Sequence, residues 1–227
     1  MKKIRFVVAS RESETHFHQK TLTGQSLNVF KVPFLELKLY ANNTQGLSHI
    51  YNQEIMLAKN DPAILVFAHD DLLLLGYYWV NDIFNALKVF DLVGVAGNTR
   101  RLPLQPSWVY TNTQLESDEL QFLSGVVGHG NTYPPAMLNI YGQPGQQVKL
   151  LDGMLLIADS EVLNQHDLKF DERFKFHFYD MDFCRQAELK NLRMGTWPIS
   201  LVHQSGGNYQ SDSWHQSYRD YLEKWGD

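Results

Sequence analysis

The feature that most constrains the fold of this chain is an apolar run at residues 63–68 that ends directly in His69-Asp70-Asp71. A continuous apolar run of this length is typical of a strand that is buried on both faces, as in a parallel sheet covered by helices. Open α/β sheets bind their ligands at the carboxyl ends of such strands. The run therefore predicts an α/β fold with a charged ligand site at one edge of its sheet.

Strands and helices alternate in the first half of the chain. A polar, poorly patterned stretch follows the first strand to about residue 26. The alternation is typical of an open, mostly parallel sheet flanked by helices. The predicted strands are residues 4–9, 34–40, 63–68 and 92–96, and the predicted helices are residues 47–58 and 79–89.

The character of the sequence changes between residues 98 and 149, where Pro, Gly, Asn and Gln are frequent. We expect an elaborated loop or a small hairpin layer beside the sheet, with strand-like segments at 108–110 and 120–127. Long irregular segments of compact domains are often functional. The remaining predicted elements are a strand at 150–158 interrupted by Asp152-Gly153, a strand at 196–202, and helices at 180–191 and 213–225.

The size and charge of the chain limit the classes of function. Its 227 residues suffice for one large domain, and its net charge of −5 offers no basic surface to nucleic acid. A single cysteine, Cys184, excludes an intrachain disulfide and a cysteine-rich zinc site. No stretch reaches the roughly 18 apolar residues of a transmembrane segment, so we expect a cytoplasmic protein.

The His69-Asp70-Asp71 run places carboxylates at a rigid strand end, and this arrangement suits a divalent cation. Magnesium and manganese are held in proteins by one or two carboxylates together with substrate phosphates. The alternative is that the two aspartates only form a turn or cap a helix. We favour ligation, because the three polar residues follow an unbroken apolar run and concentrate charge where such sheets bind ligands.

Asp180 and Asp182 stand at the start of a predicted helix. An N-cap role and an interaction with the helix dipole would explain both residues without any chemistry. A carboxylate that is fixed at a helix start can also act as a general base. The residue types alone leave both uses open.

His203 follows a predicted strand and precedes Gly206-Gly207. A single histidine at a strand end is more often a hydrogen-bonded structural residue than a ligand, although glycines let the backbone approach a ligand closely. None of the other histidines has the spacing of a metal motif such as HExxH, so we treat them as structural or exposed. They are His16, His18, His49, His129, His166, His177 and His215.

An aromatic stripe lies on one side of the predicted closing helix. A stripe at helical spacing is usually part of the core, so we expect it to pack on the domain. A homodimer contact and a membrane-surface contact are the alternatives. The stripe consists of Trp214, Tyr218, Tyr221, Leu222 and Trp225.

Seven segments occur in the order and spacing of a known family. They are residues 46–52, 65–71, 93–97, 151–153, 170–174, 178–184 and 203–207. On these segments the chain resembles the family 2 type of nucleotide-diphospho-sugar glycosyltransferases, and most of all its short bacterial glycosyltransferase-like branch. The resemblance implies one GT-A domain over residues 1–227, with a nucleotide-binding half at 1–100, an acceptor and catalytic half at 101–207 and a closing helix at 208–227.

The resemblance also assigns roles to individual residues. Asp71 matches the metal-binding acid that ends the DxD motif, and His69 stands where that motif has its first aspartate. Asp180 matches the general base, with Tyr179 in place of the preceding acid, and His203 matches a histidine that some members use as a further metal ligand. The residues matched to the nucleotide-sugar site are Ser10, Asn43, Asn52, Asp70, Asp71, Asp152 and Gly153.

The implied activity is that of a hexosyltransferase, which moves a sugar from a donor such as a UDP-sugar to an acceptor hydroxyl. Manganese or magnesium would assist, and the anomeric configuration would invert. The implied acceptor is a carbohydrate or a lipid-linked glycan, as in polysaccharide biosynthesis, and the protein would then work at the inner face of the membrane. A glycosidase with two carboxylates and no metal remains an alternative, as does an inert sugar-binding domain of the same fold.

Overall fold

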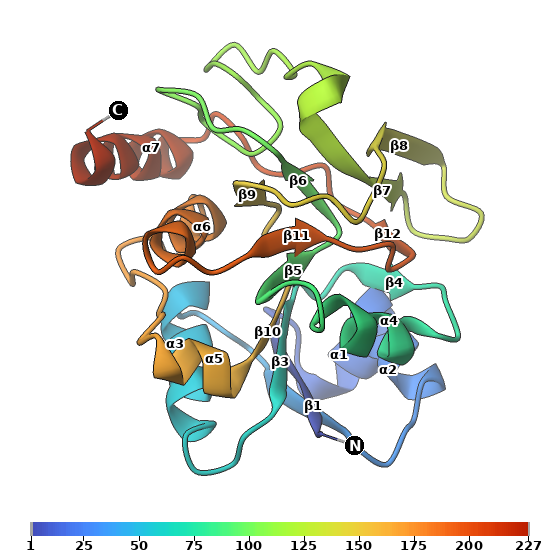
Figure 1. Cartoon of the computed structure of the whole chain (residues 1–227). Coiled ribbons are helices and arrows are strands. Elements are labelled where there is room, and N and C mark those ends of the chain that lie inside the picture. Colours follow the sequence, from blue (N-terminus) through green and yellow to red (C-terminus); the bar gives the residue numbers. More distant parts are fainter. Residues whose placement is uncertain (1, 227) are drawn as a thin grey trace.

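The computed structural model describes residues 2–226, which fold into two neighbouring sheets with helices packed around them (Figure 1). This arrangement confirms the predicted α/β class. Within residues 2–226, no helix is long and apolar enough to cross a membrane.

A mixed sheet of six strands forms the centre of the fold. Its strands are β1 (Ile4–Ala9), β2 (Leu35–Tyr40), β3 (Ile64–Ala68), β5 (Leu92–Gly94), β10 (Leu155–Asp159) and β11 (Met194–Thr196). They are ordered β11-β5-β10-β3-β1-β2, with β10 antiparallel to both of its neighbours and the other pairs parallel. Every residue of β3 is buried, as the apolar run predicts, so the His-Asp-Asp sequence stands at the end of a rigid central strand.

A second sheet lies beside the first and contains the region between residues 98 and 149 that predicts a hairpin layer. Its strands are β4 (Leu72–Leu74), β6 (Ala96–Asn98), β7 (Leu123–His129), β8 (Met137–Gly142), β9 (Leu150–Leu151) and β12 (Leu201–His203). The hairpin is β7 with β8, and β12 pairs with β7 in parallel so that His203 lies opposite His129. This pairing brings a distant histidine to the same edge as the end of β3.

Three predicted strands are each divided between the two sheets. The prediction of continuous strands at 92–96 and 196–202 is wrong, whereas the interruption of the 150–158 strand at Asp152-Gly153 is confirmed. Residues 92–96 contribute to β5 and β6, residues 150–158 to β9 and β10, and residues 196–202 to β11 and β12. Residues 92–96 cross from one sheet to the other within an unbroken apolar run. Local periodicity does not reveal such a crossing, because the choice of sheet depends on distant strands.

Helices cover the central sheet on both sides, with α3, α5 and α6 on one side and α1, α2 and α4 on the other (Figure 1). They are α1 (Glu14–Lys20), α2 (Leu22–Val29), α3 (Leu47–Leu57), α4 (Trp79–Ala86), α5 (Ser160–Gln165), α6 (Tyr179–Leu189) and α7 (Asp212–Trp225), with a short 3₁₀ turn at Leu120–Phe122. Four of them, α3, α4, α6 and α7, lie at predicted positions. The helix α5 is an addition that the sequence pattern did not predict.

The polar, poorly patterned stretch after β1 forms two short helices that its pattern did not predict. Ser13 accepts a hydrogen bond from the backbone of His16, and Thr21 accepts one from Gly24, so each residue caps one of the short helices α1 and α2. The two helices pack so closely that a Cβ on Gly24 would lie 2.0 Å from the carbonyl oxygen of Phe17. Caps and close packing stabilise helices whose apolar periodicity is weak.

The closing helix α7 packs on the domain, as the aromatic stripe predicts. Trp214 and Tyr221 are each 2% exposed. Near the end of the helix, Lys224 Nζ lies 2.6 Å from Asp182 Oδ1, and Trp225 Nε1 donates to the same oxygen at 2.9 Å. Asp182 is fully buried, so α7 supplies the positive charge that a buried carboxylate in α6 requires.

Truncation after Ser211 is expected to produce an insoluble or much less stable protein. The loss of α7 would expose Phe178, on which Trp214 and Tyr221 pack, and would remove both the cation and the indole N–H that pair with Asp182. Soluble yield and thermal unfolding measure the effect, with the conservative variant Arg219→Lys as a control. A truncated protein that is soluble and as stable as the parent would favour the homodimer or membrane-contact alternative.

Candidate active site

Four segments meet at one edge of the two sheets. The loop after β3 contributes His69, Asp70 and Asp71, and the end of β12 contributes His203. The turn at residues 152–153 between β9 and β10 lies against the start of α6, where Tyr179 and Asp180 stand. The structure thus brings together most of the residues that the sequence assigns to chemistry.

His69, Asp71 and His203 form a cluster with the composition of a metal site. Each side chain offers one ligand atom, and these atoms lie within 4.8 Å of one another. Asp71 Oδ2 accepts a hydrogen bond from the backbone of Ser205 at 3.1 Å. Asp71 Oδ1 lies 3.3 Å from His203 Nε2 and is buried without a hydrogen-bond partner among residues 2–226.

The cluster fits a divalent cation. Asp71 Oδ1 makes no hydrogen bond among the described residues, and a cation beside Asp71 would add to the compensation that its 3.3 Å contact with His203 gives. One carboxylate and two imidazoles suit manganese, which accepts both oxygen and nitrogen ligands. The sequence assigns Asp71 and His203 to the metal, and the geometry adds His69 to them as a candidate.

The protonation of this cluster follows from its contacts. Burial alone would raise the pKa of Asp71, but the adjacent His203 outweighs it and holds that pKa well below the usual value. Burial likewise opposes protonation of His203, yet the partner carboxylate raises the pKa of this imidazole. The pKa of His69 is lowered by burial and by the neighbouring His203. Asp71 is therefore the anion of the group, and His69 is its neutral imidazole.

The Asp180 carboxylate contacts the Asp152–Gly153 turn through the backbone N–H of Gly153. Its Oδ2 accepts a hydrogen bond from Gly153 N at 3.0 Å, and its Oδ1 accepts one from Met181 N at 2.9 Å. Burial and the nearby charge of Asp152 raise the pKa of Asp180 to about 7. The N-cap position belongs to Phe178, which has a φ of 63°, so the interpretation of Asp180 as the helix cap is wrong.

Asp152 and Asp182 are both committed to structural contacts. Asp152 accepts hydrogen bonds from Met154 N at 2.7 Å and from Trp108 Nε1 at 2.6 Å, one on each oxygen. Asp182 contacts Lys224 and Trp225, and it also accepts a bond from Gln186 at 2.6 Å. Asp180 differs from them in that its pKa is raised to about 7.

Ser10 and Asn43 extend the site away from the cluster. The Ser10 hydroxyl donates to Asp70 Oδ2, and Asn43 N donates to the carbonyl of Ser10 at 2.8 Å. Burial raises the pKa of Asp70 although this hydroxyl opposes the effect. Ser10, Asn43 and Asp70 therefore form one connected group at the ends of β1, β2 and β3, as their assignment to one nucleotide-sugar site requires.

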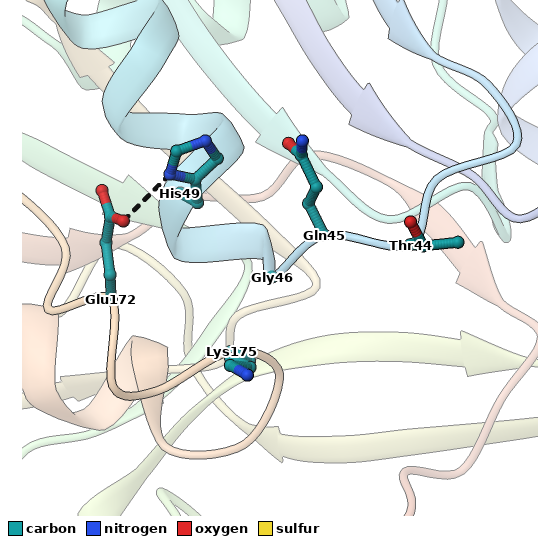
Figure 2. A pocket seen from close by; sticks show the side chains of 6 residues that line it. All are labelled: Thr44, Gln45, Gly46, His49, Glu172 and Lys175. Atoms are coloured by element: carbon teal, nitrogen blue, oxygen red, sulfur yellow. Dashed lines mark hydrogen bonds and ion pairs between the residues drawn. The ribbon is translucent and has the colours of Figure 1, made fainter.

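A pocket of about 310 Å³ lies at the start of α3 and at the residues just before it (Figure 2). Across it, His49 Nδ1 lies 2.9 Å from Glu172 Oε2. The side chains of the metal-type cluster do not line this pocket. Its lining residues are Thr44, Gln45, Gly46, His49, Glu172 and Lys175.

The structure does not bring Asn52 to the acids. Its amide donates to the Phe170 carbonyl at 2.9 Å and to Glu172 at 3.1 Å, and it accepts from Phe170 N at 2.9 Å. These bonds tie α3 to the segment that leads into α6. Asn52 therefore has a structural role in this part of the fold. In the described part of the chain, no hydrogen bond joins it to Asp70 or Asp71.

His129 lies at the site although the sequence groups it with the structural histidines. It ends β7 opposite His203, and the two ring centroids are 6.2 Å apart. Its Nε2 is buried and has no hydrogen-bond partner among the described residues. In the sequence, His129 stands out only because it lies between Gly128 and Gly130. The pairing of β7 with β12 is what places it beside His203.

Two solved structures share the fold at low sequence identity. The Drosophila β1,4-galactosyltransferase 7 mutant in complex with manganese, UDP-Gal and xylobiose has a TM-score of 0.54 and 10% identity, over 96% of this chain and 80% of that chain. GalNAc-T7 with UDP, GalNAc and Mn²⁺ has a TM-score of 0.56 and 10% identity, over 98% of this chain and 48% of that chain. Both are glycosyltransferases, and the shared fold is GT-A.

No curated protein matches the sequence. The family described as "Glycosyltransferase like family" matches residues 9–224. The match covers nearly the whole chain, including the His-Asp-Asp run, the Asp152–Gly153 turn, Asp180 and His203. The chain therefore belongs to this glycosyltransferase-like family, as its resemblance to the family 2 type predicts.

Proposed function

We propose that this protein is an inverting hexosyltransferase that moves a sugar from a nucleotide-diphospho-sugar, with UDP as the nucleotide, to an acceptor hydroxyl. The observation that carries the proposal is the pairing of a metal-type cluster with Asp180, a carboxylate whose pKa is about 7, across one turn. The solved relatives add support, because one contains manganese with UDP-Gal and the other Mn²⁺ with UDP and GalNAc.

Each part of the site has a task in this reaction. A divalent cation held by Asp71, His203 and His69 would neutralise the negative charge that develops on the leaving diphosphate. Asp180 takes the proton of the acceptor hydroxyl, whose oxygen forms a bond to the anomeric carbon. The bond from that carbon to the diphosphate breaks, and the nucleoside diphosphate leaves with the electron pair. One base and one displacement invert the anomeric configuration.

The proposal also includes the acceptor and the cellular location. We assign the acceptor to carbohydrates or lipid-linked glycans, as in polysaccharide biosynthesis, and the protein to the cytoplasm or the inner face of the membrane. Residues 1–100 would hold the nucleotide, and residues 101–207 would hold the acceptor beside Asp180.

A direct test is incubation with a panel of nucleotide sugars and measurement of released nucleoside diphosphate, with manganese and with EDTA. We expect release from one or more UDP-sugars that depends on the metal. An absence of release from every donor, with UDP and manganese bound normally, would favour the inert sugar-binding domain. A glycosidase is disfavoured because it would use two carboxylates and no metal, whereas this edge places Asp180 beside a cluster with the composition of a metal site.

The transfer rate is expected to rise with pH and to level off above about 7. Asp180 must be ionised to accept a proton, and its pKa is raised to about 7, so the rate should fall about tenfold for each unit below that value. The measurement is kcat/KM between pH 5.5 and 8.5 at saturating manganese. In Asp152→Asn the midpoint should move to lower pH, because the charge of Asp152 contributes to the raised pKa. A flat profile would contradict Asp180 as the base.

His203→Ala is expected to weaken manganese binding while leaving metal-free nucleotide binding almost unchanged. A neutral imidazole ligates through its lone pair, so its loss should affect the cation and not the base or ribose of the donor. Titration of UDP with manganese and with EDTA measures the two affinities, and His166→Ala on the outer end of α5 is the control. Equal losses with and without the metal would show that His203 is structural.

A further inference from the structure

We propose that Tyr179 is a positioning residue, whose hydroxyl fixes the His69 imidazole in the tautomer that directs the lone pair of Nδ1 to the cation. This inference rests on the metal-assisted transfer proposed above. It concerns the position where the family has an acid before its general base and this chain has tyrosine.

Two hydrogen bonds form a chain through the Tyr179 hydroxyl. The hydroxyl lies 2.7 Å from the carbonyl oxygen of Gly153, and His69 Nε2 lies 2.9 Å from the hydroxyl. A carbonyl oxygen can only accept, so the proton of the hydroxyl is committed to Gly153. The hydroxyl oxygen must then accept from His69, and Nε2 must carry a proton.

This protonation decides what His69 offers to the cluster. In a neutral imidazole with a proton on Nε2, the lone pair is on Nδ1. Nε2 is engaged by Tyr179, and no hydrogen bond to Nδ1 is found among residues 2–226, so Nδ1 is the nitrogen that remains for ligation in the cluster with Asp71 and His203. Metal-bound histidines are commonly oriented in this way, by a partner on the nitrogen that does not bind the metal.

The hydroxyl of Tyr179 has little freedom to move. The residue is 3% exposed, and its ring contacts those of Tyr51 and Phe170 at centroid distances of 6.0 and 6.1 Å. A Cβ on Gly153 would lie 2.4 Å from the hydroxyl, so the turn and the tyrosine are in tight contact. A rigid hydroxyl can hold the imidazole in one orientation.

The same turn also holds the proposed base. Gly153 accepts from Tyr179 through its carbonyl and donates to the Asp180 carboxylate through its N–H at 3.0 Å. Gly153 thereby links the orientation of His69 to the position of Asp180. Gly153 thus holds both Tyr179 and Asp180 through its backbone.

The test compares two tyrosine-to-phenylalanine variants. Tyr179→Phe removes the hydroxyl that contacts His69, whereas Tyr51→Phe removes a neighbouring buried hydroxyl that has no hydrogen-bond partner among the described residues. We expect Tyr179→Phe to weaken manganese binding, measured by calorimetry, about tenfold, the usual scale for the partner of a metal ligand. Tyr51→Phe should bind manganese within twofold of the parent. Equal losses in the two variants would overturn the proposal.

A double-mutant cycle separates positioning of His69 from general structural support. In a His69→Ala background, Tyr179→Phe should cost no further manganese affinity, because the hydroxyl acts only through the imidazole. If Tyr179→Phe costs about tenfold in both backgrounds, the hydroxyl supports the fold instead, and the proposal is wrong.

A second pair of variants tests the tautomer without altering Tyr179. The amide of His69→Asn occupies the place of Nδ1, whereas that of His69→Gln reaches the place of Nε2. His69→Asn should retain the higher manganese affinity, and the reverse order would overturn the assignment of Nδ1. If the parent itself binds no manganese, the metal-assisted function fails; if it binds manganese and these variants do not differ as stated, only the role of Tyr179 fails.

Discussion

Replacement of Asp180 by asparagine is expected to lower the transfer rate about 100-fold or more, the usual scale for a positioned general base. Asparagine has nearly the same shape but cannot take the proton of the acceptor hydroxyl. Because Phe178 and not Asp180 occupies the N-cap position of α6, the substitution removes no helix cap. The amide nitrogen of asparagine cannot accept the bond from Gly153 N or Met181 N that one carboxylate oxygen now accepts, so thermal unfolding of the variant is measured beside its rate. A rate loss larger than any loss of folded protein reports the chemistry.

Binding of the donor provides the control for this variant. Asp180 acts on the acceptor, so the affinity for UDP with manganese should stay within about twofold of the parent value. Asp167→Asn, on an exposed turn beside Lys169, should leave both the rate and the affinity unchanged. A fully active Asp180→Asn protein would show that another group accepts the proton. Asp182 could not replace it without breaking its buried pair with Lys224.

The elements that the sequence predicts well are those with a strong local pattern. The buried strand β3, the helices α3 and α6 and the aromatic stripe of α7 all lie where their periodicity places them. The elements that it misses depend on distant partners. Residues 92–96 change sheets while their apolar pattern continues, and the short helices α1 and α2 depend on the caps Ser13 and Thr21 more than on an apolar face.

The candidate site divides in a similar way. Asp71, Asp180 and His203 were predicted because the resemblance compares their order along the chain with that of a family. The connection of His69 to Tyr179, and the place of His129 opposite His203, arise only when β12 pairs with β7 and α6 packs against the Asp152–Gly153 turn. Contacts of this kind join residues that are far apart in the sequence, so spacing rules for histidines do not detect them.

Asp71→Asn is expected to fold normally and to lose most of its manganese-dependent affinity for UDP. The asparagine oxygen can still accept the hydrogen bond from Ser205 N, so the loop after β3 keeps its anchor. At the position of Oδ1, however, an amide group would replace the buried oxygen that has no partner among the described residues. An amide NH₂ donates hydrogen bonds and has no lone pair for a cation, and the negative charge is lost as well.

The size of the effect follows from the position of Asp71 in the cluster. Changes to groups that only support a metal ligand cost 10–100-fold in affinity, so loss of the single anionic ligand should cost about 100-fold or more. Titration of UDP with manganese measures this loss, and the same titration with EDTA should give equal, weak binding for parent and variant. Asp167→Asn again serves as the exposed control. If Asp71→Asn binds UDP with manganese as tightly as the parent, Asp71 is not a ligand, and the buried oxygen beside His203 has a structural role instead.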